Sequence, residues 1–239
     1  MTFDLVTIFP GMFVGAFQDG MLARARRQGR VLIRIHDLRR WGQGPHRQVD
    51  DAPYGGGGGM ILRPEPIFEA VEWIRQRYPV ERDRVVLLSP QGLRLGHAVA
   101  RSLAEHERVI LICGRYEGVD ERVREAVADE ELSIGDVVLT GGEIPAMVVV
   151  DAVSRFVPGV LGQESATEND SFARRTLDHP HYTRPARYRD LAVPDVLLSG
   201  DHAAVAAWRA QRAEEITREK RPDLLSPSAS LAPERRARG

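Results

Sequence analysis

Residues 133–143 combine residue types that suit a ligand-binding turn: an apolar run, a Gly-Gly pair and a helix start. Glycine lets the backbone approach a ligand closely, because it has no side chain and tolerates positive φ. The apolar residues 137–139 beside the glycines offer a flat wall for an aromatic base. A strand, a tight turn and a helix without any ligand would have the same pattern, so this segment alone leaves both interpretations open.

Two further glycine-bearing turns follow apolar runs, at residues 89–92 and 114–120. In open α/β sheets, loops beyond the carboxyl ends of parallel strands meet in one crevice, where ligands bind. Three such turns predict one composite pocket built largely from backbone, with tight turns that bind nothing as the alternative. The chain has no G-x-x-x-x-G-K-[ST] motif and no G-x-G-x-x-G that opens a helix after a strand. A P-loop is therefore excluded, and a dinucleotide site is poorly supported.

A fourth loop carries five consecutive glycines, residues 55–59, after a stretch that includes His46, Asp50 and Tyr54. Ordering each glycine costs roughly 1–2 kcal/mol of backbone entropy, so such a loop either stays mobile or is ordered by a partner. A flexible connector is the alternative interpretation. The polar neighbours favour a loop that faces the substrate.

His179-Pro180-His181, preceded by Asp178, is a weak metal motif. The two histidines lack the usual i, i+4 helical spacing, and no further ligand is evident. The sequence therefore predicts no metal site there.

Apolar runs alternate with longer amphipathic stretches along residues 1–161, a pattern typical of an α/β domain with a mostly parallel sheet and helices on both faces. The predicted strands are residues 3–8, 31–35, 85–88, 109–113 and 137–139. The predicted helices are residues 12–27, 65–78, 95–105, 119–128 and 143–156.

The pattern changes after Val160. Residues 162–170 are polar without apolar periodicity, which predicts a flexible linker. Residues 201–220 form an Ala-rich helical pattern with a start signal at Ser199-Gly200-Asp201. The sequence therefore predicts a second, small and mainly helical domain over residues 171–239.

The composition is that of an ordinary globular protein, with 43% hydrophobic and 28% charged residues. No apolar run approaches the ~20 residues that span a bilayer, and no secretion signal is evident. The lone Cys113 has no partner for an internal disulfide, which fits a reducing compartment. Together these features predict a cytoplasmic protein without a membrane span. The net charge of −1 divides into +4 over residues 171–239 and −5 over the rest, a weak indication that the C-terminal part binds RNA phosphate.

With these motifs in order, the chain closely resembles the bacterial tRNA (guanine-N1)-methyltransferases, knotted methyltransferases of the SPOUT class. Matching segments occur jointly at residues 49–57, 88–92, 113–122, 133–147, 151–162, 170–172 and 181–185. The matches run from the first predicted strand through Trp208-Arg209 and cover nearly the whole chain.

The resemblance implies that the C-terminal part of the α/β domain forms a trefoil knot, a rare exception to the rule against threaded chains. It also implies a homodimer in which each tRNA site uses residues of both subunits, and S-adenosylmethionine as the methyl donor, held in a bent shape by the knot. By matched position, the donor pocket would comprise Leu88, Ser89, Pro90, Gly114, Tyr116, Glu117, Ser133, Ile134, Gly135, Asp136, Val137, Val138, Leu139, Gly141, Gly142 and Pro145.

The implied reaction is methylation at N1 of the guanine at tRNA position 37, 3′ to the anticodon. Asp170 matches the general base that removes the N1 proton, and Arg155 matches the residue that stabilises negative charge on O6. From position alone, the two would be a helix-capping Asp and a solvated helix-terminal Arg. The residues expected to hold the extruded guanine or to order the linker are Asp50, Gly59, Ser171 and Asp178.

The C-terminal domain would grip the anticodon arm. The resemblance also implies a benefit from Mg²⁺, for which the sequence shows no ligand cluster. Three positions depart from common family patterns: Gly58 replaces a frequent proline, Val137 a frequent aromatic residue and His179 a frequent cysteine. Because the pocket relies on backbone, these departures predict altered affinity and not lost function.

Two alternatives remain beside this interpretation. One is a related knotted methyltransferase that acts on ribose or ribosomal RNA, which would need neither the pair Asp170 and Arg155 nor this C-terminal domain. The other is a non-catalytic RNA-binding protein that kept the fold. The presence of both residues and of the glycine turns argues against it.

Overall fold

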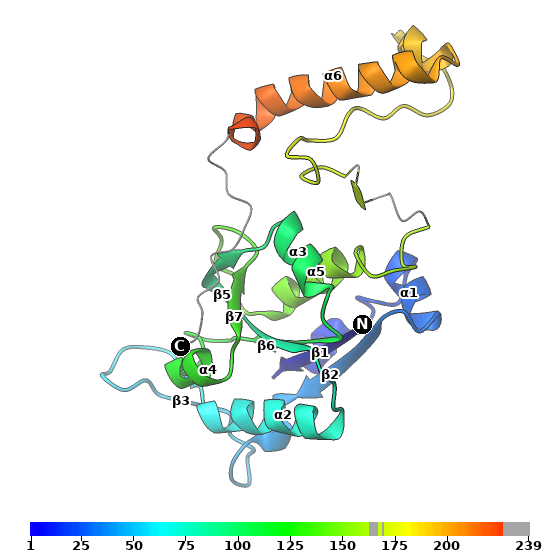
Figure 1. Ribbon diagram of the computed structural model, residues 1–239. Coiled ribbons are helices and arrows are strands. Elements are labelled where there is room, and N and C mark those ends of the chain that lie inside the picture. Colours follow the sequence, from blue (N-terminus) through cyan, green and yellow to red (C-terminus); the bar gives the residue numbers. More distant parts are fainter. Residues whose placement is uncertain (163–166, 169, 227–239) are drawn as a thin grey trace. The chain divides into compact units, whose positions relative to one another are not determined.

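The computed structural model describes residues 1–162, 167–168 and 170–226. The chain divides into two compact units, Met1–Glu164 and Ser165–Gly239, and each is described by itself (Figure 1). Most of the predicted linker, at residues 163–166 and 169, lies outside the described residues, as do residues 227–239 of the predicted C-terminal domain.

The centre of the first unit is a five-stranded sheet in the order β2–β1–β6–β5–β7, in which every pair is parallel. Its strands are β1 (Thr2–Thr7), β2 (Leu32–Asp37), β5 (Asp83–Arg94), β6 (Arg108–Cys113) and β7 (Glu130–Ser133). The register places Phe3 of β1 opposite Ile33 of β2 and Val109 of β6. Every residue of β6 is buried, as expected for a central strand with both faces covered. The predicted α/β class with a mostly parallel sheet is confirmed.

Helices cover both faces of this sheet (Figure 1). Neighbouring residues of β6 point to opposite faces, so Leu111 joins one buried cluster and Ile112 the other. The first cluster includes residues of α1 (Gly20–Arg27), α3 (His97–Leu103) and α5 (Glu143–Ser154). The second includes residues of α2 (Pro64–Arg77) and α4 (Glu121–Ala126).

Two predicted elements are wrong. The helix over residues 12–27 is replaced by a short 3-10 helix, η1 (Pro10–Phe13), and by α1, because Gly15 between them and Gly20 at the start of α1 adopt positive φ. The strand over residues 137–139 does not form, and the sheet instead takes β7, four residues upstream of that run. Gly135, at φ +144°, turns the chain away from the sheet directly after β7.

Two features of the first unit were not predicted. β5 continues through the predicted turn at residues 89–92, with a register shift against β7 between Leu88 and Leu93. A short antiparallel pair, β3 (Asp50–Asp51) and β4 (Ile61–Leu62), brackets the five-glycine loop.

The second unit is built around α6 (His202–Lys220), whose predicted start is confirmed. The Asp201 carboxylate accepts hydrogen bonds from the backbone N–H groups of Ala203 and Ala204, both at 3.0 Å, and so caps the helix. The shorter elements are β8 (Arg187–Tyr188), β9 (Leu191–Ala192), η4 (Asp195–Leu198) and η5 (Pro222–Leu225). Among the described residues of the chain, no helix has the length and apolarity needed to cross a membrane.

A buried ion-pair group joins β1 to β2 and gives a test of the fold. The fully buried Asp4 carboxylate accepts hydrogen bonds from Arg34 (2.7 and 2.9 Å) and contacts His36 Nε2 at 2.7 Å. Burial alone would raise the pKa of Asp4, but the bonds from His36 and Arg34 lower it below its usual range. Asp4→Asn is expected to destabilise the first unit by about 2–3 kcal/mol at pH 7, because it leaves a partly buried guanidinium without its counter-ion.

Thermal unfolding measures this effect, with an expected drop in Tm of about 4–10 °C. A carboxyl group whose pKa is lower in the folded state stabilises the protein at pH values above its pKa in the unfolded chain. This contribution is lost as the pH falls through its pKa in the folded state. The difference between wild type and variant should therefore narrow below about pH 4. Asp190→Asn, at an exposed position, is the control; equal Tm values for wild type and Asp4→Asn at pH 7 would contradict the prediction.

Candidate functional site

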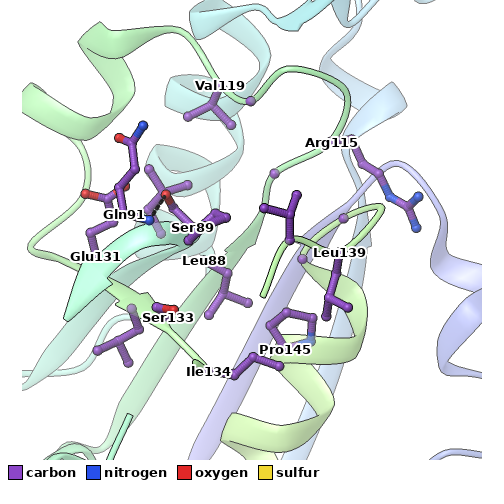
Figure 2. Close-up of a pocket in the computed structure, with 18 of the residues that line it drawn as sticks. Leu88, Ser89, Gln91, Arg115, Val119, Glu131, Ser133, Ile134, Leu139 and Pro145 are labelled. Carbon is purple, nitrogen blue, oxygen red and sulfur yellow. Dashed lines mark hydrogen bonds between the residues drawn. The ribbon is translucent and has the colours of Figure 1, made fainter. Parts of the chain in front are cut away.

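A cavity of about 490 Å³ opens at the carboxyl ends of β5, β6 and β7 (Figure 2). Its lining residues fall within residues 87–91, 114–124 and 131–145, so the three segments singled out in the sequence do meet around one cavity, the first of them as part of β5 and not as a turn. Its volume lies within the ~300–1,000 Å³ typical of cofactor pockets. Figure 2 shows Leu88, Leu139 and Pro145 among the side chains that give the cavity an apolar wall.

All but two of the residues predicted for the donor pocket line this cavity; the exceptions are Gly135 and Asp136. Gly135 instead shapes the wall, because its backbone N–H and C=O both bond to Ser133 Oγ, at 3.1 and 2.9 Å. The exposed Asp136 carboxylate forms an ion pair with Arg94 Nη2 at 2.7 Å. The structure therefore gives Asp136 a surface partner and no place in the lining.

Other lining residues were missed by the sequence prediction, among them Gln91, Arg115, Val119, Glu131 and Thr140. Each lies in or beside a segment that was singled out, so proximity along the chain was the available signal.

Arg115 is the most informative of the missed residues, because it fixes the turn that enters α5. Its Nε donates to Glu143 at 2.8 Å and its Nη1 donates to the Thr140 carbonyl at 3.0 Å. Glu143 is fully buried and also accepts a 2.6 Å hydrogen bond from Thr7 Oγ1. A residue of β1 thus positions the cavity wall through two side chains, a connection that no sequence spacing indicates.

The Gly141-Gly142 pair lies where no side chain fits. A Cβ built on Gly141 would stand 2.1 Å from Arg115 Nε, and one built on Gly142 would stand 2.6 Å from Cys113 Cα. The Gly142 N–H also donates to the Gly114 carbonyl at 2.9 Å. The wall is therefore made of closely packed backbone, as the glycine pattern predicted.

The five-glycine loop lies next to another wall of the cavity. The Glu117 N–H donates to the Met60 carbonyl at 3.1 Å, and a Cβ on Gly59 would come within 2.5 Å of Glu117 Oε1. Burial and a hydrogen bond to Asp50 raise the pKa of Tyr116. Asp50 and Gly59, which were predicted to contact substrate, thus lie beside two lining residues of the cavity.

Arg155 follows the last residue of α5 and is not among the residues that line the cavity. Pro145, in the first turn of the same helix, does line it. Ten residues of α-helix separate the two, a rise of about 15 Å. Within one protein chain, α5 therefore holds Arg155 away from the cavity to which its own N-terminus contributes.

The remaining predicted site residues belong to the second unit. The Asp170 carbonyl accepts from Ala173 N–H at 3.1 Å, which makes it part of a turn. Ser171 Oγ accepts a 2.9 Å hydrogen bond from the Asp178 N–H. The Asp178 carboxylate in turn accepts from the His179 N–H at 2.7 Å. The structure thus links Ser171 and Asp178, two residues that the resemblance assigns to one role.

Comparison with known proteins gives a consistent result. The family model for tRNA (Guanine-1)-methyltransferase TrmD matches residues 1–227. A tRNA (guanine-N(1)-)-methyltransferase of Dehalococcoides mccartyi is 51% identical over 225 residues, which cover 94% of this chain and 90% of that protein. The protein of the same name from Geobacter sulfurreducens is 51% identical over 225 residues, covering 94% and 91%.

The protein of that name from Moorella thermoacetica is 50% identical over 236 residues, covering 99% of this chain and 94% of its own. Identity at this level along almost the full length of both chains indicates that the proteins share the fold and its loops. The chain belongs to the tRNA (Guanine-1)-methyltransferase TrmD family.

Proposed function

We propose that this protein transfers the methyl group of S-adenosylmethionine to N1 of the guanine at position 37 of tRNA. The names of relatives that share about half of its residues support methylation of a tRNA guanine at N1. The observation that supports this donor is the cavity lined by residues between 87 and 145, where Gly114, Gly141 and Gly142 contribute to a closely packed wall. A cytoplasmic location, where tRNA is found, completes the proposal.

The cavity suits a nucleoside with a charged sulfonium tail. Leu88, Leu139 and Pro145 would pack against the adenine, while backbone groups of the glycine turns hydrogen-bond to it. Glu117, a lining residue beside the five-glycine loop, would place a carboxylate near the positive charge. When bound, S-adenosylmethionine supplies an electrophilic methyl group. The lining residues hold it and exclude water.

Asp170 and Arg155 would act on the guanine. N1 of guanine carries a proton and becomes nucleophilic as the proton leaves, so a carboxylate at the linker, Asp170, would accept it. Negative charge then develops on O6, where the planar guanidinium of Arg155 would donate hydrogen bonds. Ser171 and Asp178 would hold the base or its neighbours from the second unit, and Asp50 and Gly59 from the first.

We further propose that a homodimer assembles each site. The distance along α5 between Pro145 and Arg155 argues that a given cavity takes its Arg155 from the other subunit. An exposed apolar surface supports a partner there: Val138 is 81% exposed, and Ile144 and Val148 lie one turn apart on α5 with 46% and 40% exposed. Closed symmetric dimers bury such self-complementary faces.

Subunit mixing tests the dimer. Arg155→Ala alone is expected to lower kcat by about 10²–10³. Mixed dimers of inactive Asp170→Ala and Arg155→Ala subunits should regain activity. In such a dimer, one site combines the wild-type Arg155 of the first subunit with the wild-type Asp170 of the second, while the other site carries both substitutions. Co-expression of the two variants in equal amounts should give about a quarter of wild-type activity. About half of the dimers are then mixed, and each mixed dimer has one intact site of two. Activity no greater than that of either variant alone would mean that one chain supplies both groups.

The trefoil knot belongs to the same proposal. Its support is the resemblance of the sequence to the knotted methyltransferases of the SPOUT class. The implied benefit from Mg²⁺ has no comparable support, since no group of three metal-ligand side chains gathers at the cavity in the described part of the chain.

A methylation assay tests the function as a whole. With labelled S-adenosylmethionine and unmodified tRNA transcripts, we expect label on a position-37 guanine that follows another guanine, and none when that base is replaced. Label on ribose or ribosomal RNA would identify a different knotted methyltransferase. RNA binding without turnover would make the protein a non-catalytic binder.

A further inference from the structure

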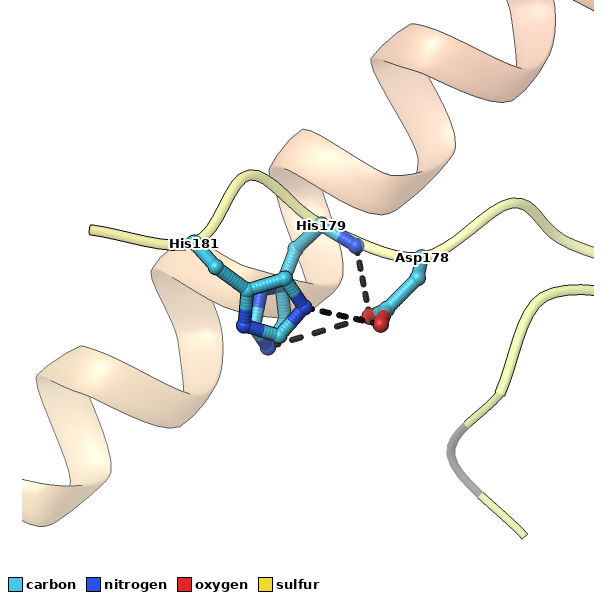
Figure 3. Close-up of side chains that lie close together, drawn as sticks. All are labelled: Asp178, His179 and His181. Carbon is cyan, nitrogen blue, oxygen red and sulfur yellow. Dashed lines mark hydrogen bonds and ion pairs between the residues drawn. The ribbon is translucent and has the colours of Figure 1, made fainter. Parts of the chain in front are cut away.

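Three side chains of the second unit converge on one point: Asp178, His179 and His181 (Figure 3). One ligand atom from each lies within 4.8 Å of the others. His181 Nε2 is 2.9 Å from Asp178 Oδ2, and His179 Nε2 is 3.9 Å from Asp178 Oδ1. Figure 3 shows both rings turned toward the same carboxylate, so the His-Pro-His segment presents two imidazoles to one anion.

The hydrogen bonding of His179 leaves its Nε2 atom available to a ligand. His179 Nδ1 lies 3.2 Å from the Pro180 carbonyl, an acceptor, so Nδ1 carries the proton. In the neutral ring, Nε2 then has a free lone pair. His179 Nε2 lies 3.9 Å from Asp178 Oδ1, too far for a hydrogen bond, and a cation bound between the two atoms would suit this separation.

The distances suit a metal ion as that cation. Zinc binds imidazole nitrogen at about 2.0–2.1 Å and carboxylate oxygen at about 2.0–2.2 Å, so two ligand atoms of one ion stand about 3–4 Å apart. A histidine that binds a metal through one ring nitrogen usually donates a hydrogen bond from the other nitrogen, often to a backbone carbonyl. That hydrogen bond fixes the orientation and the tautomer of the ring. The ring of His181 is 70% exposed and needs only a small rotation to exchange its bond to Asp178 for a bond to the ion.

The neighbours of the three side chains favour a preformed site. Pro180 fixes φ between the two histidines and limits the freedom of the segment. The Asp178 carboxylate accepts a hydrogen bond from the His179 N–H and lies 2.9 Å from His181 Nε2, so it is held beside both histidines. The two histidines line a hollow of about 390 Å³, which leaves room for water on the open positions of an ion.

We infer that Asp178, His179 and His181 bind a divalent transition-metal ion of the zinc class. Two imidazoles and one carboxylate suit Zn²⁺, Ni²⁺ or Co²⁺ far better than Mg²⁺, which prefers an all-oxygen shell. The bound ion joins both ends of the segment 178–181 and, through the bond from Asp178 N–H to Ser171, stiffens the chain around Ser171. None of the three ligands lines the donor cavity, so the inference does not rest on the proposed methyl transfer.

Calorimetry on the full-length protein without a histidine tag tests the inference, with Zn²⁺ as the probe. One ion should bind per chain, and His179→Ala should weaken binding by at least about 10-fold. His202→Ala, at an exposed histidine in the same unit, is the matched control and should bind Zn²⁺ as wild type does. Asp178→Asn, which keeps the backbone hydrogen bonds but removes the charge, should also weaken binding.

Co²⁺ gives a second readout that is independent of stability. Its visible absorption should show a low-symmetry nitrogen and oxygen site in wild type and in His202→Ala, and that spectrum should be lost in His179→Ala. Thermal unfolding of each variant without metal shows whether it is folded. Equal Zn²⁺ binding by folded His179→Ala and His202→Ala, or no saturable binding by wild type, would overturn the inference.

Discussion

Asp170→Ala is expected to lower kcat by about 10²–10⁴, the usual contribution of a positioned general base. Without the carboxylate, N1 of guanine keeps its proton and has no free lone pair with which to attack the methyl group. The affinity for S-adenosylmethionine should stay at the wild-type value, because the cavity is lined by residues 87–145 of the first unit. Single-turnover methylation of tRNA measures the first effect, and calorimetric titration of the donor measures the second.

Two variants make this prediction specific. Asp170→Asn keeps the size and hydrogen-bonding capacity of the side chain but cannot accept the proton, so it should be nearly as slow as Asp170→Ala. Asp190→Ala, at an exposed carboxylate of the same unit, should retain wild-type activity. Full turnover by Asp170→Asn would remove Asp170 as the base and leave the proposed donor cavity untouched.

Gly142→Ala is expected to weaken donor binding by about 10-fold or more. The added Cβ would stand 2.6 Å from Cys113 Cα and 3.0 Å from Gly114 N, and both are backbone atoms that cannot rotate away. The turn between residues 139 and 142 must then shift. An overpacked site costs about 1–3 kcal/mol, and 1.4 kcal/mol corresponds to one factor of ten in Kd.

The effect would come from lack of space and not from backbone strain, because Gly142 has an ordinary φ of −80°. Gly96→Ala is the matched control: Gly96 also precedes a helix and has a negative φ, of −136°, but nothing lies within 4 Å of its Cβ position. Calorimetry with the demethylated donor product, S-adenosylhomocysteine, measures both. Wild-type affinity in folded Gly142→Ala would place the donor away from this turn.

The strands of the sheet were largely predictable because a buried parallel strand is a short apolar run with little ambiguity. β6 (Arg108–Cys113) illustrates this, since both of its faces are covered and nearly every residue must be apolar. The run at residues 137–139 has the same composition, yet Val138 is among the most exposed apolar residues. An apolar run indicates burial against something, and composition does not say whether that is the sheet, a ligand or a second chain.

The sequence by itself determined the α/β class, the glycine turns and the family, because these follow from local residue patterns and from motifs in fixed order. Tertiary structure alone decided that Glu143 accepts hydrogen bonds from both Arg115 and Thr7, and that Asp136 pairs with Arg94 outside the cavity. The reason is physical: such contacts depend on where side chains point after distant segments have packed, and spacing along the chain carries that information only within one helix or strand.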